Sequence, residues 1–198
     1  MASSILRVTA CGCLLVSASS LTLAGTQDEV VSSYRAAGVP AAEVIVTLER
    51  TGCLGSCPVY KLTLNGTGEV IYEGRRFVKS SGSYSSRIAE KSVLELANSL
   101  LTRRFFDAGE EYAGHDRIYR RDGRLIVTRT VVQDGPSMVL SLTIGRYTRT
   151  VRVKDSDPLR LGEVADAIDR AADVENWIGA PCERSRPIGP PLSECENE

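Results

Sequence analysis

The feature that most constrains the fold is a pair of short alternating segments joined by turn residues. Residues 59–64 and 69–73 alternate polar and apolar side chains with a period of two, which is typical of half-buried strands. Asn65-Gly66 stands between them, and both residue types tolerate the positive φ of a tight hairpin turn. A turn this short leaves no room for a crossover, so the sequence predicts antiparallel pairing.

Further strands are predicted from apolar and β-branched runs at 44–48, 76–80, 138–144 and 147–153. The first of these opens the domain near Glu43, and the last two are joined by a turn at Gly145-Arg146. The polar segment 107–133 carries its own turn signal, Asp122-Gly123, between two apolar runs. We therefore expect a protruding hairpin in this segment.

Two segments have the periodicity of amphipathic helices. The apolar stripe of the first, within residues 88–104, comprises Val93, Leu96, Ala97, Leu100 and Leu101. The stripe of the second comprises Leu161, Val164, Ala165, Ile168 and Ala172. We expect this second helix to begin with Asp157 as N-cap and Pro158 at the first helical position. Phe105-Phe106 follows the first helix, where both rings are expected to pack against the sheet.

Hairpins in sequence order around two helices predict an α+β fold. The expected architecture is a single antiparallel β-sheet of hairpins with two main amphipathic helices packed on one face.

The first 24 residues have the organisation of a secretory signal. Residues 1–7 carry one positive charge and no acid, residues 8–24 carry no charge, and Thr22-Leu23-Ala24 supplies the small residues that a signal peptidase requires. We predict cleavage after Ala24 and an exported product, periplasmic or secreted. Ser, Thr and Gly dilute the apolar run too much for a span of about 20 residues, so no transmembrane anchor is expected in the mature chain. A second interpretation stays open, because residues 8–11 resemble a lipoprotein box in which Cys11 is acylated.

The rest of the chain divides into three parts. A linker at 25–42 contains a short polar helix at 28–38, the domain proper covers 43–178, and a proline-rich tail covers 179–198. The 24 basic side chains fall to 23 without Arg7, against 25 acidic ones, so the mature chain has a net charge of −2. This balance gives no reason to expect a nucleic-acid partner.

The mature chain keeps an even set of cysteines: Cys53, Cys57, Cys182 and Cys195. An even number in an exported chain predicts disulfides. Three pairings are possible, and we favour Cys53 with Cys57 and Cys182 with Cys195, because short loops cost the least entropy to close.

The run 47–62 contains the pattern Cys-x-Gly-x-Cys-Pro-x-Tyr, formed by Cys53, Gly55, Cys57, Pro58 and Tyr60. It resembles the opening of the bacterial family known as domain of unknown function 6438. Further matches are Val-x-Tyr-Glu-Gly at 70–74, Phe105-Phe106, Asp134-Gly135-Pro136 and a closing Trp-Ile, so the resemblance covers 44–178. It implies an exported location and a sheet-and-helix fold, and no activity. The chain departs from the family pattern in its longer 107–133 segment and its proline tail.

Cys53 and Cys57 also admit a redox interpretation, because two neighbouring thiols on a loop can cycle between dithiol and disulfide. Their three-residue gap differs from the two-residue gap of thioredoxin-type motifs, and no strand-then-helix arrangement follows. We therefore expect a structural bond, with thiol-disulfide redox activity as the alternative function.

Other chemistry has weaker support. His115, the only histidine, stands near Glu110, Glu111 and Asp116, a set of nitrogen and oxygen ligands that a divalent metal accepts. A single histidine among flexible carboxylates is more typical of a solvated loop, so we predict no metal and no cofactor. The serines lie outside any Gly-x-Ser-x-Gly elbow, which argues against a hydrolase.

Arginines gather in the 107–133 segment, and the candidate ligand face comprises Arg117, Arg120, Arg121 and Arg124. Guanidinium forks match phosphate and carboxylate, although Glu110, Glu111, Asp116 and Asp122 partly cancel the field. The resulting hypothesis is an exported, non-catalytic binding or structural module of the cell envelope. Its expected partner is an envelope protein or an anionic envelope polymer.

Overall fold

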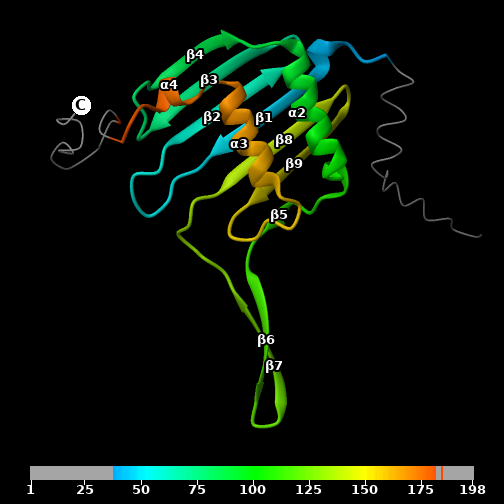
Figure 1. Ribbon diagram of the computed structural model, residues 1–198, viewed down its shortest axis with the longest axis vertical. Helices are drawn as coiled ribbons and strands as arrows, with labels where there is room; N and C mark the ends of the chain where they lie inside the picture. Colours follow the sequence, from blue (N-terminus) through cyan, green and yellow to red (C-terminus); the bar gives the residue numbers. More distant parts are fainter. Residues whose placement is uncertain (1–37, 182–183, 185–198) are drawn as a thin grey trace, which may run out of the picture.

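The computed structural model describes residues 38–181 and 184 of the 198-residue chain. Its centre is a seven-stranded sheet with the order β4-β3-β2-β1-β8-β9-β5 (Figure 1). The strands are β1 (Val44–Arg50), β2 (Val59–Asn65), β3 (Glu69–Arg76), β4 (Gly82–Arg87), β5 (Glu111–Tyr112), β8 (Met138–Ile144) and β9 (Tyr147–Val153). Neighbouring strands are antiparallel except for β5, which lies parallel to β9 over two residue pairs.

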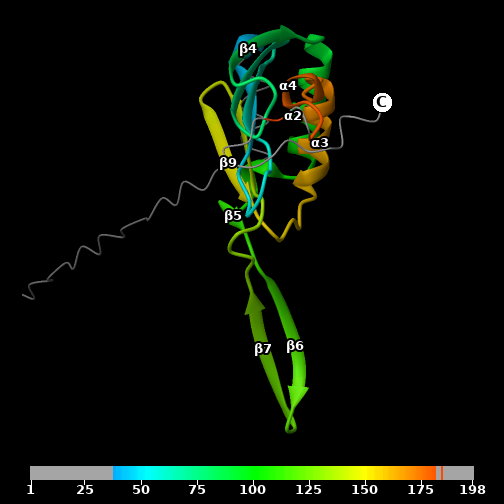
Figure 2. The ribbon, with the colours of Figure 1, turned by 90° about the vertical axis from the view of Figure 1, so that its left-hand side faces the viewer.

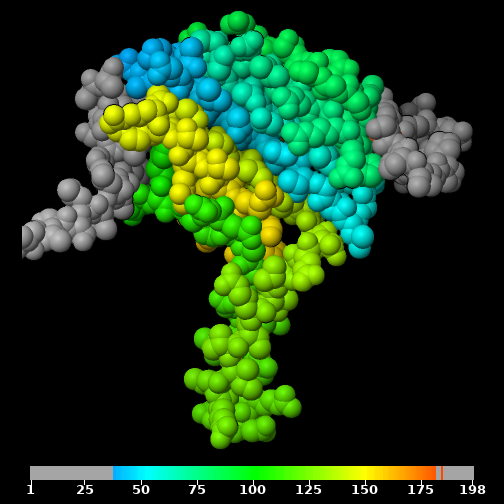
Figure 3. Space-filling view, turned by 180° about the vertical axis from the view of Figure 1, so that it is seen from behind, coloured from blue at the N-terminus to red at the C-terminus, as the bar shows by residue number. Residues whose placement is uncertain are grey.

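The helices cover one face of this sheet. They are α2 (Glu90–Thr102), α3 (Leu161–Ala171) and the short α4 (Glu175–Ile178), and 3-10 turns η1 (Ala41–Glu43) and η2 (Phe105–Asp107) complete the set. Figure 2 shows α2, α3 and α4 together on the same side of the strands, and Figure 3 shows the opposite face without a helix over it. The predicted α+β fold, with an antiparallel sheet and two main helices on one face, is confirmed.

Strand alternation places the core between the sheet and the helices. Leu62, Leu48 and Leu140 lie side by side across β2, β1 and β8, and each is fully buried. The helices meet this layer with Val93 and Leu100 of α2 and with the predicted stripe of α3. Every leucine buried here contributes roughly 1.5–3 kcal/mol through the hydrophobic effect.

The segment after α2 forms a separate two-stranded ribbon, β6 (His115–Arg121) and β7 (Arg124–Thr130), which we call the arm. Figure 1 shows the arm projecting away from the body. Its strands pair antiparallel as far as Arg121 and Arg124, which leaves a two-residue loop. Asp122 and Gly123 have φ values of 49° and 75°, as a hairpin turn with two left-handed residues requires. The predicted protruding hairpin is confirmed.

The short strand predicted at 76–80 is wrong, since the strand lies at Gly82–Arg87. All six side chains of β4 are exposed, so this edge strand has no apolar alternation to reveal it. Val78 is instead a fully buried loop residue.

The predicted start of the second helix is also wrong, because α3 begins at Leu161. Asp157 still stabilises the helix start from outside it. Its two carboxylate oxygens accept the backbone N–H groups of Leu161 and Gly162, each at 2.7 Å. Those N–H groups have no partner within a helix, and a carboxylate near a helix N-terminus is favourable.

The turn between β2 and β3 forms as a hairpin, but the positive φ lies at Gly68 rather than at Asn65-Gly66. Asn65 accepts a hydrogen bond from the Thr67 N–H at 3.0 Å, which shapes the turn. Gly66 is required for another reason, since a Cβ there would lie 2.2 Å from the carbonyl oxygen of Ala41.

The predicted signal at 1–24, nearly all of the helix at 28–38, and Cys182 and Cys195 of the tail lie outside the described residues. Within the part of the chain that the structure describes, no helix combines the length and apolar character needed to span a membrane.

Candidate functional site

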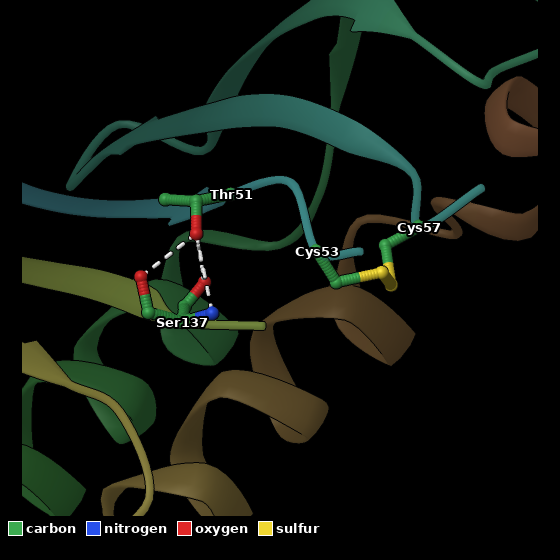
Figure 4. Close-up of a disulfide and its surroundings, with 4 residues drawn as sticks. All are labelled: Thr51, Cys53, Cys57 and Ser137. Carbon is green, nitrogen blue, oxygen red and sulfur yellow. Dashed lines mark hydrogen bonds between the residues drawn. A yellow bond between two sulfur atoms is a disulfide. The ribbon is translucent and has the colours of Figure 1, made fainter. Parts of the chain in front are cut away.

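The loop between β1 and β2 is closed by a disulfide between Cys53 and Cys57, whose Cα atoms are 5.7 Å apart. The predicted pairing of these two cysteines is confirmed. Figure 4 shows Thr51 next to the disulfide, facing Ser137 on the segment that leads into β8. The Thr51 hydroxyl lies 2.7 Å from the Ser137 hydroxyl, and the Thr51 N–H donates to the Ser137 carbonyl at 2.9 Å. Thr51 therefore fixes the start of the disulfide loop to the segment that leads into β8.

A pocket of about 540 Å³ opens beside this loop, between the sheet and α3. Its apolar wall comprises Pro58, Pro136, Met138, Val153 and Ile178. A second hollow of about 410 Å³ continues along the C-terminal part of α3 to α4, and it shares Tyr60, Asp169 and Ile178 with the first. We call the two hollows together the groove.

The floor of the groove holds a network of charged and polar side chains. Arg50 on β1 donates to Asp169 from Nε at 3.2 Å and from Nη2 at 2.7 Å, and also to Asp166 at 2.7 Å. The Tyr60 hydroxyl donates to the other Asp169 oxygen at 2.8 Å. The Asp169 side chain is 16% exposed and that of Asp166 is 61% exposed. Asp169 is thus largely enclosed within the network, whereas most of the Asp166 side chain is exposed to solvent.

The electrostatics of the network follow from burial and pairing. Burial raises the pKa of Asp169, against the lowering effect of Arg50 and of the Tyr60 hydrogen bond. Burial, followed by the negative charge of Asp169, raises the pKa of Tyr60, so its phenol remains a hydrogen-bond donor at neutral pH. Burial alone would lower the pKa of Arg50, but the two aspartates raise it overall, so Arg50 stays a cation. These groups satisfy one another and hold the strands against α3.

The arm is the second candidate feature. Cross-strand partners share a face, so β6–β7 pairing places Arg117, Arg121 and Arg124 on one face. Arg120 lies opposite Leu125 on the other face. The predicted four-arginine ligand face is therefore wrong in this detail, because Arg120 and Arg121 are adjacent in a strand and point to opposite sides.

The face with Arg120 combines three apolar side chains with the charged Asp116 and Arg129. Ile118 pairs with Val127, and Leu125 pairs with Arg120. Ile118 is 70% exposed, Leu125 75% and Val127 66%. Three large apolar side chains on one side of a ribbon that stands away from the body form an exposed apolar patch.

Asp155, just after β9, anchors the base of the arm. Its carboxylate accepts the Gly114 N–H at 2.6 Å and the Val132 N–H at 2.8 Å. The Gly114 amide belongs to the segment that enters the arm and the Val132 amide to the segment that leaves it. The Asp155 side chain therefore holds both segments together. The hydrogen bonds from Gly114 and Val132 lower the pKa of Asp155.

His115 stands at the start of β6 and is exposed, with Asp116 on the other face of the ribbon. Glu111 on β5 pairs with Lys154 at 3.0 Å instead of turning toward the histidine. No group of three metal-ligating side chains occurs among residues 38–181 and 184.

Sequence reasoning missed the groove network. Arg50, Tyr60 and Asp169 are far apart in the chain, with 119 positions between Arg50 and Asp169. One signal was available, since Asp166 and Asp169 are one helical turn apart on the polar side of a predicted amphipathic helix.

Taken together, the fold and the site define a small α+β domain with a groove beside a disulfide loop and a projecting arm. The chain belongs to the family described as domain of unknown function 6438, whose sequence model matches residues 44–172. No curated protein and no solved structure shows a significant match to the chain.

Proposed function

We propose that the protein is an exported, non-catalytic binding module of the cell envelope and that the arm engages its partner. The observation that carries this proposal is the patch of Ile118, Leu125 and Val127 on the arm. An isolated two-stranded ribbon is marginally stable in water, and exposed apolar patches mark interaction sites. A partner that covers the patch would stabilise the ribbon and remove apolar surface from water at the same time.

A binding role accounts for the polar groups better than catalysis does. Tyr60 and Arg50 both donate hydrogen bonds to Asp169. Tyr60 therefore stays a neutral donor and Arg50 a permanent cation, and neither is suited to act as a catalytic acid or base. The single histidine of the chain stands on the exposed arm, far along the chain from this network. General acid–base chemistry needs a group that changes protonation near neutral pH beside the reacting atoms.

The arrangement of the arm favours a protein over an anionic polymer as partner. A polymer of phosphates or carboxylates would be bound best by arginines on one face. Arg120, however, lies on the other face of the ribbon from Arg117, Arg121 and Arg124. Exposed apolar side chains beside an arginine, as Ile118, Leu125 and Val127 lie beside Arg120 on one face, are typical of protein interfaces. Tyr119, 44% exposed, supplies the aromatic component on the arginine face.

Two features support export. The first 24 residues have the charge and residue pattern of a signal peptide, and the Cys53–Cys57 disulfide suits an oxidising compartment. Cell fractionation followed by N-terminal sequencing tests this part, with Gly25 expected as the first residue in the periplasm or medium. An uncut chain beginning at Met1 in the cytosol would overturn it.

Site-specific photocross-linking tests the arm directly. A photoreactive residue at position 127 of the arm is compared in the native host with one at Ser83, which is exposed on β4. We expect a discrete adduct only at 127, and its loss when Ile118→Ser and Leu125→Ser are added. As a charge control, Arg117→Gln should weaken the adduct less than the two apolar changes together. Equal labelling at both positions would contradict the proposal.

A further inference from the structure

We propose that the arm of one copy of this protein docks in the groove of a second copy. This inference rests on the proposed function, because it takes the arm as the docking element and names its partner. The partner surface is the groove beside α3 and α4, and the binding combines charge attraction with burial of the apolar patch.

Arginines predominate on the arm, and acids outnumber Arg50, Lys154 and Arg170 in the lining of the groove. Residues 115–130 carry five arginines and two aspartates, whereas residues 161–175 carry five acids and one arginine. Some of the acids are already paired, since Glu163 contacts Arg103 and Arg160. Asp173 and Glu175 are exposed at the α3–α4 end of the groove, and Asp166 keeps most of its side chain in solvent. Opposite charge on two surfaces of one molecule favours their contact between copies.

The groove also suits the apolar part of the arm. Its first hollow, of about 540 Å³, has an apolar wall that includes Met138, Val153 and Ile178. Its second hollow, of about 410 Å³, is bordered by Asp173 and Glu175, with Arg170 shortly before them in the chain. Arg120 lies on the same face of the ribbon as Leu125 and Val127, so this face can place apolar side chains against the wall and a cation against the acids.

The lengths of the two elements agree. Strands of seven residues, as in β6 and β7, span about 23 Å. At the helical rise α3 spans about 16 Å and α4 about 6 Å, with a break at residues 172–174 between them. Most of the arm can therefore lie along α3, with its remaining part near α4. Figure 1 shows the arm pointing away from its own body, so the groove that it fills belongs to another copy.

Two other self-contacts are less favourable. Arm against arm brings arginines of like charge together, since residues 115–130 carry an excess of three positive charges with His115 neutral. Arm against the uncovered sheet face meets Glu49 and Glu73, but Arg75 already bridges both at 2.7 Å and 3.8 Å. Of these three surfaces of the described chain, the groove is the best acceptor for the arm.

Sedimentation equilibrium of the mature chain, residues 25–198, tests the inference. We expect concentration-dependent self-association that weakens as salt is raised, because salt screens exposed charges. An arm variant, Arg120→Glu, and a groove variant, Asp173→Asn with Glu175→Arg, should each weaken it at least tenfold. Asn is chosen at 173 because the backbone there has φ 51°, which asparagine tolerates.

Mixing the two variants is the decisive measurement. In the mixture the unchanged arm of the groove variant meets the unchanged groove of the arm variant, so association should recover in the mixture and in neither component alone. Lys61→Glu on the uncovered sheet face is the matched control and should leave association unchanged. Circular dichroism and the urea midpoint of each variant verify that it is folded.

The outcomes separate this inference from the proposed function. A wild-type chain that remains monomeric at all concentrations overturns the inference, and so does a mixture that fails to associate when the wild type does. If a cross-link at position 127 then captures a protein of different mass, the arm still binds a partner and the proposed function stands. If the adduct has twice the mass of the chain, both are supported.

Discussion

Replacing Tyr60 by phenylalanine removes one hydrogen bond from the groove network and changes little else. Tyr60 is 4% exposed, and its hydroxyl donates to Asp169 at 2.8 Å. A hydrogen bond to a charged group contributes about 1.5–3 kcal/mol. Because 16% of the Asp169 side chain is open to water, which replaces part of the lost donor, we expect the lower end of that range. Tyr60→Phe should reduce the free energy of unfolding by about 1.5 kcal/mol.

A double-mutant cycle with Asp169→Ala tests the reasoning. That change also deprives Arg50 of two hydrogen bonds, but Arg50 keeps Asp166 and is 27% exposed. We expect a loss of about 3 kcal/mol, the low end for breaking a buried ion pair. The double variant should lose no more than Asp169→Ala alone, giving a coupling energy of about 1.5 kcal/mol. Urea unfolding with an unchanged m-value measures all three. Additivity of the two single effects to within about 0.5 kcal/mol would refute the network.

Three further predictions concern the core, the arm and the disulfide. Phe105→Ala should cost about 3–5 kcal/mol in urea unfolding, since Phe105 is fully buried after α2, whereas Phe106→Ala, at a partly buried site, should cost less. The lowered pKa of Asp155 means that its clamp is complete above the ordinary value of 3.8 and is lost as the pH falls through the lowered pKa. Pepsin cleavage of the arm, taken relative to cleavage of an unfolded peptide at the same pH, should therefore rise only in strong acid, and an unchanged ratio there would contradict the clamp. The Cys53–Cys57 bond should have a reduction potential below about −300 mV, whereas a redox enzyme requires a higher one.

The parts of the fold that could be predicted from sequence are those whose partners are neighbours along the chain. The arm and the β8–β9 hairpin have turn residues at 122–123 and 145–146 that bring adjacent segments together. The central β1–β8 pairing, by contrast, joins Leu48 to Leu140, and no local pattern marks it. The edge strand β4 was missed because its side chains are all exposed and show no alternation.

The same distinction applies to the site. The disulfide was predictable because loop closure over so short a separation is inexpensive. The contacts of Arg50 with Asp166 and Asp169 depend on packing α3 against the C-terminal end of the central strand β1, which the sequence does not specify locally. The distribution of the arm arginines over two faces could in principle be predicted from the sequence. A two-residue turn at 122–123 pairs Arg121 with Arg124 and, by alternation, puts Arg120 on the other side.

Two consecutive residues connect the base of the arm with the edge of the groove. Lys154 lines the groove, and Asp155 holds the amides of Gly114 and Val132. The arm therefore leaves the body with a direction set by the same short segment that borders the groove. A ribbon whose two strands are both held at the base loses less conformational freedom on docking than a loop whose ends are free to move. More of the contact energy is therefore available for binding. This is the physical reason for assigning recognition to an arm whose own side chains make few contacts with the body.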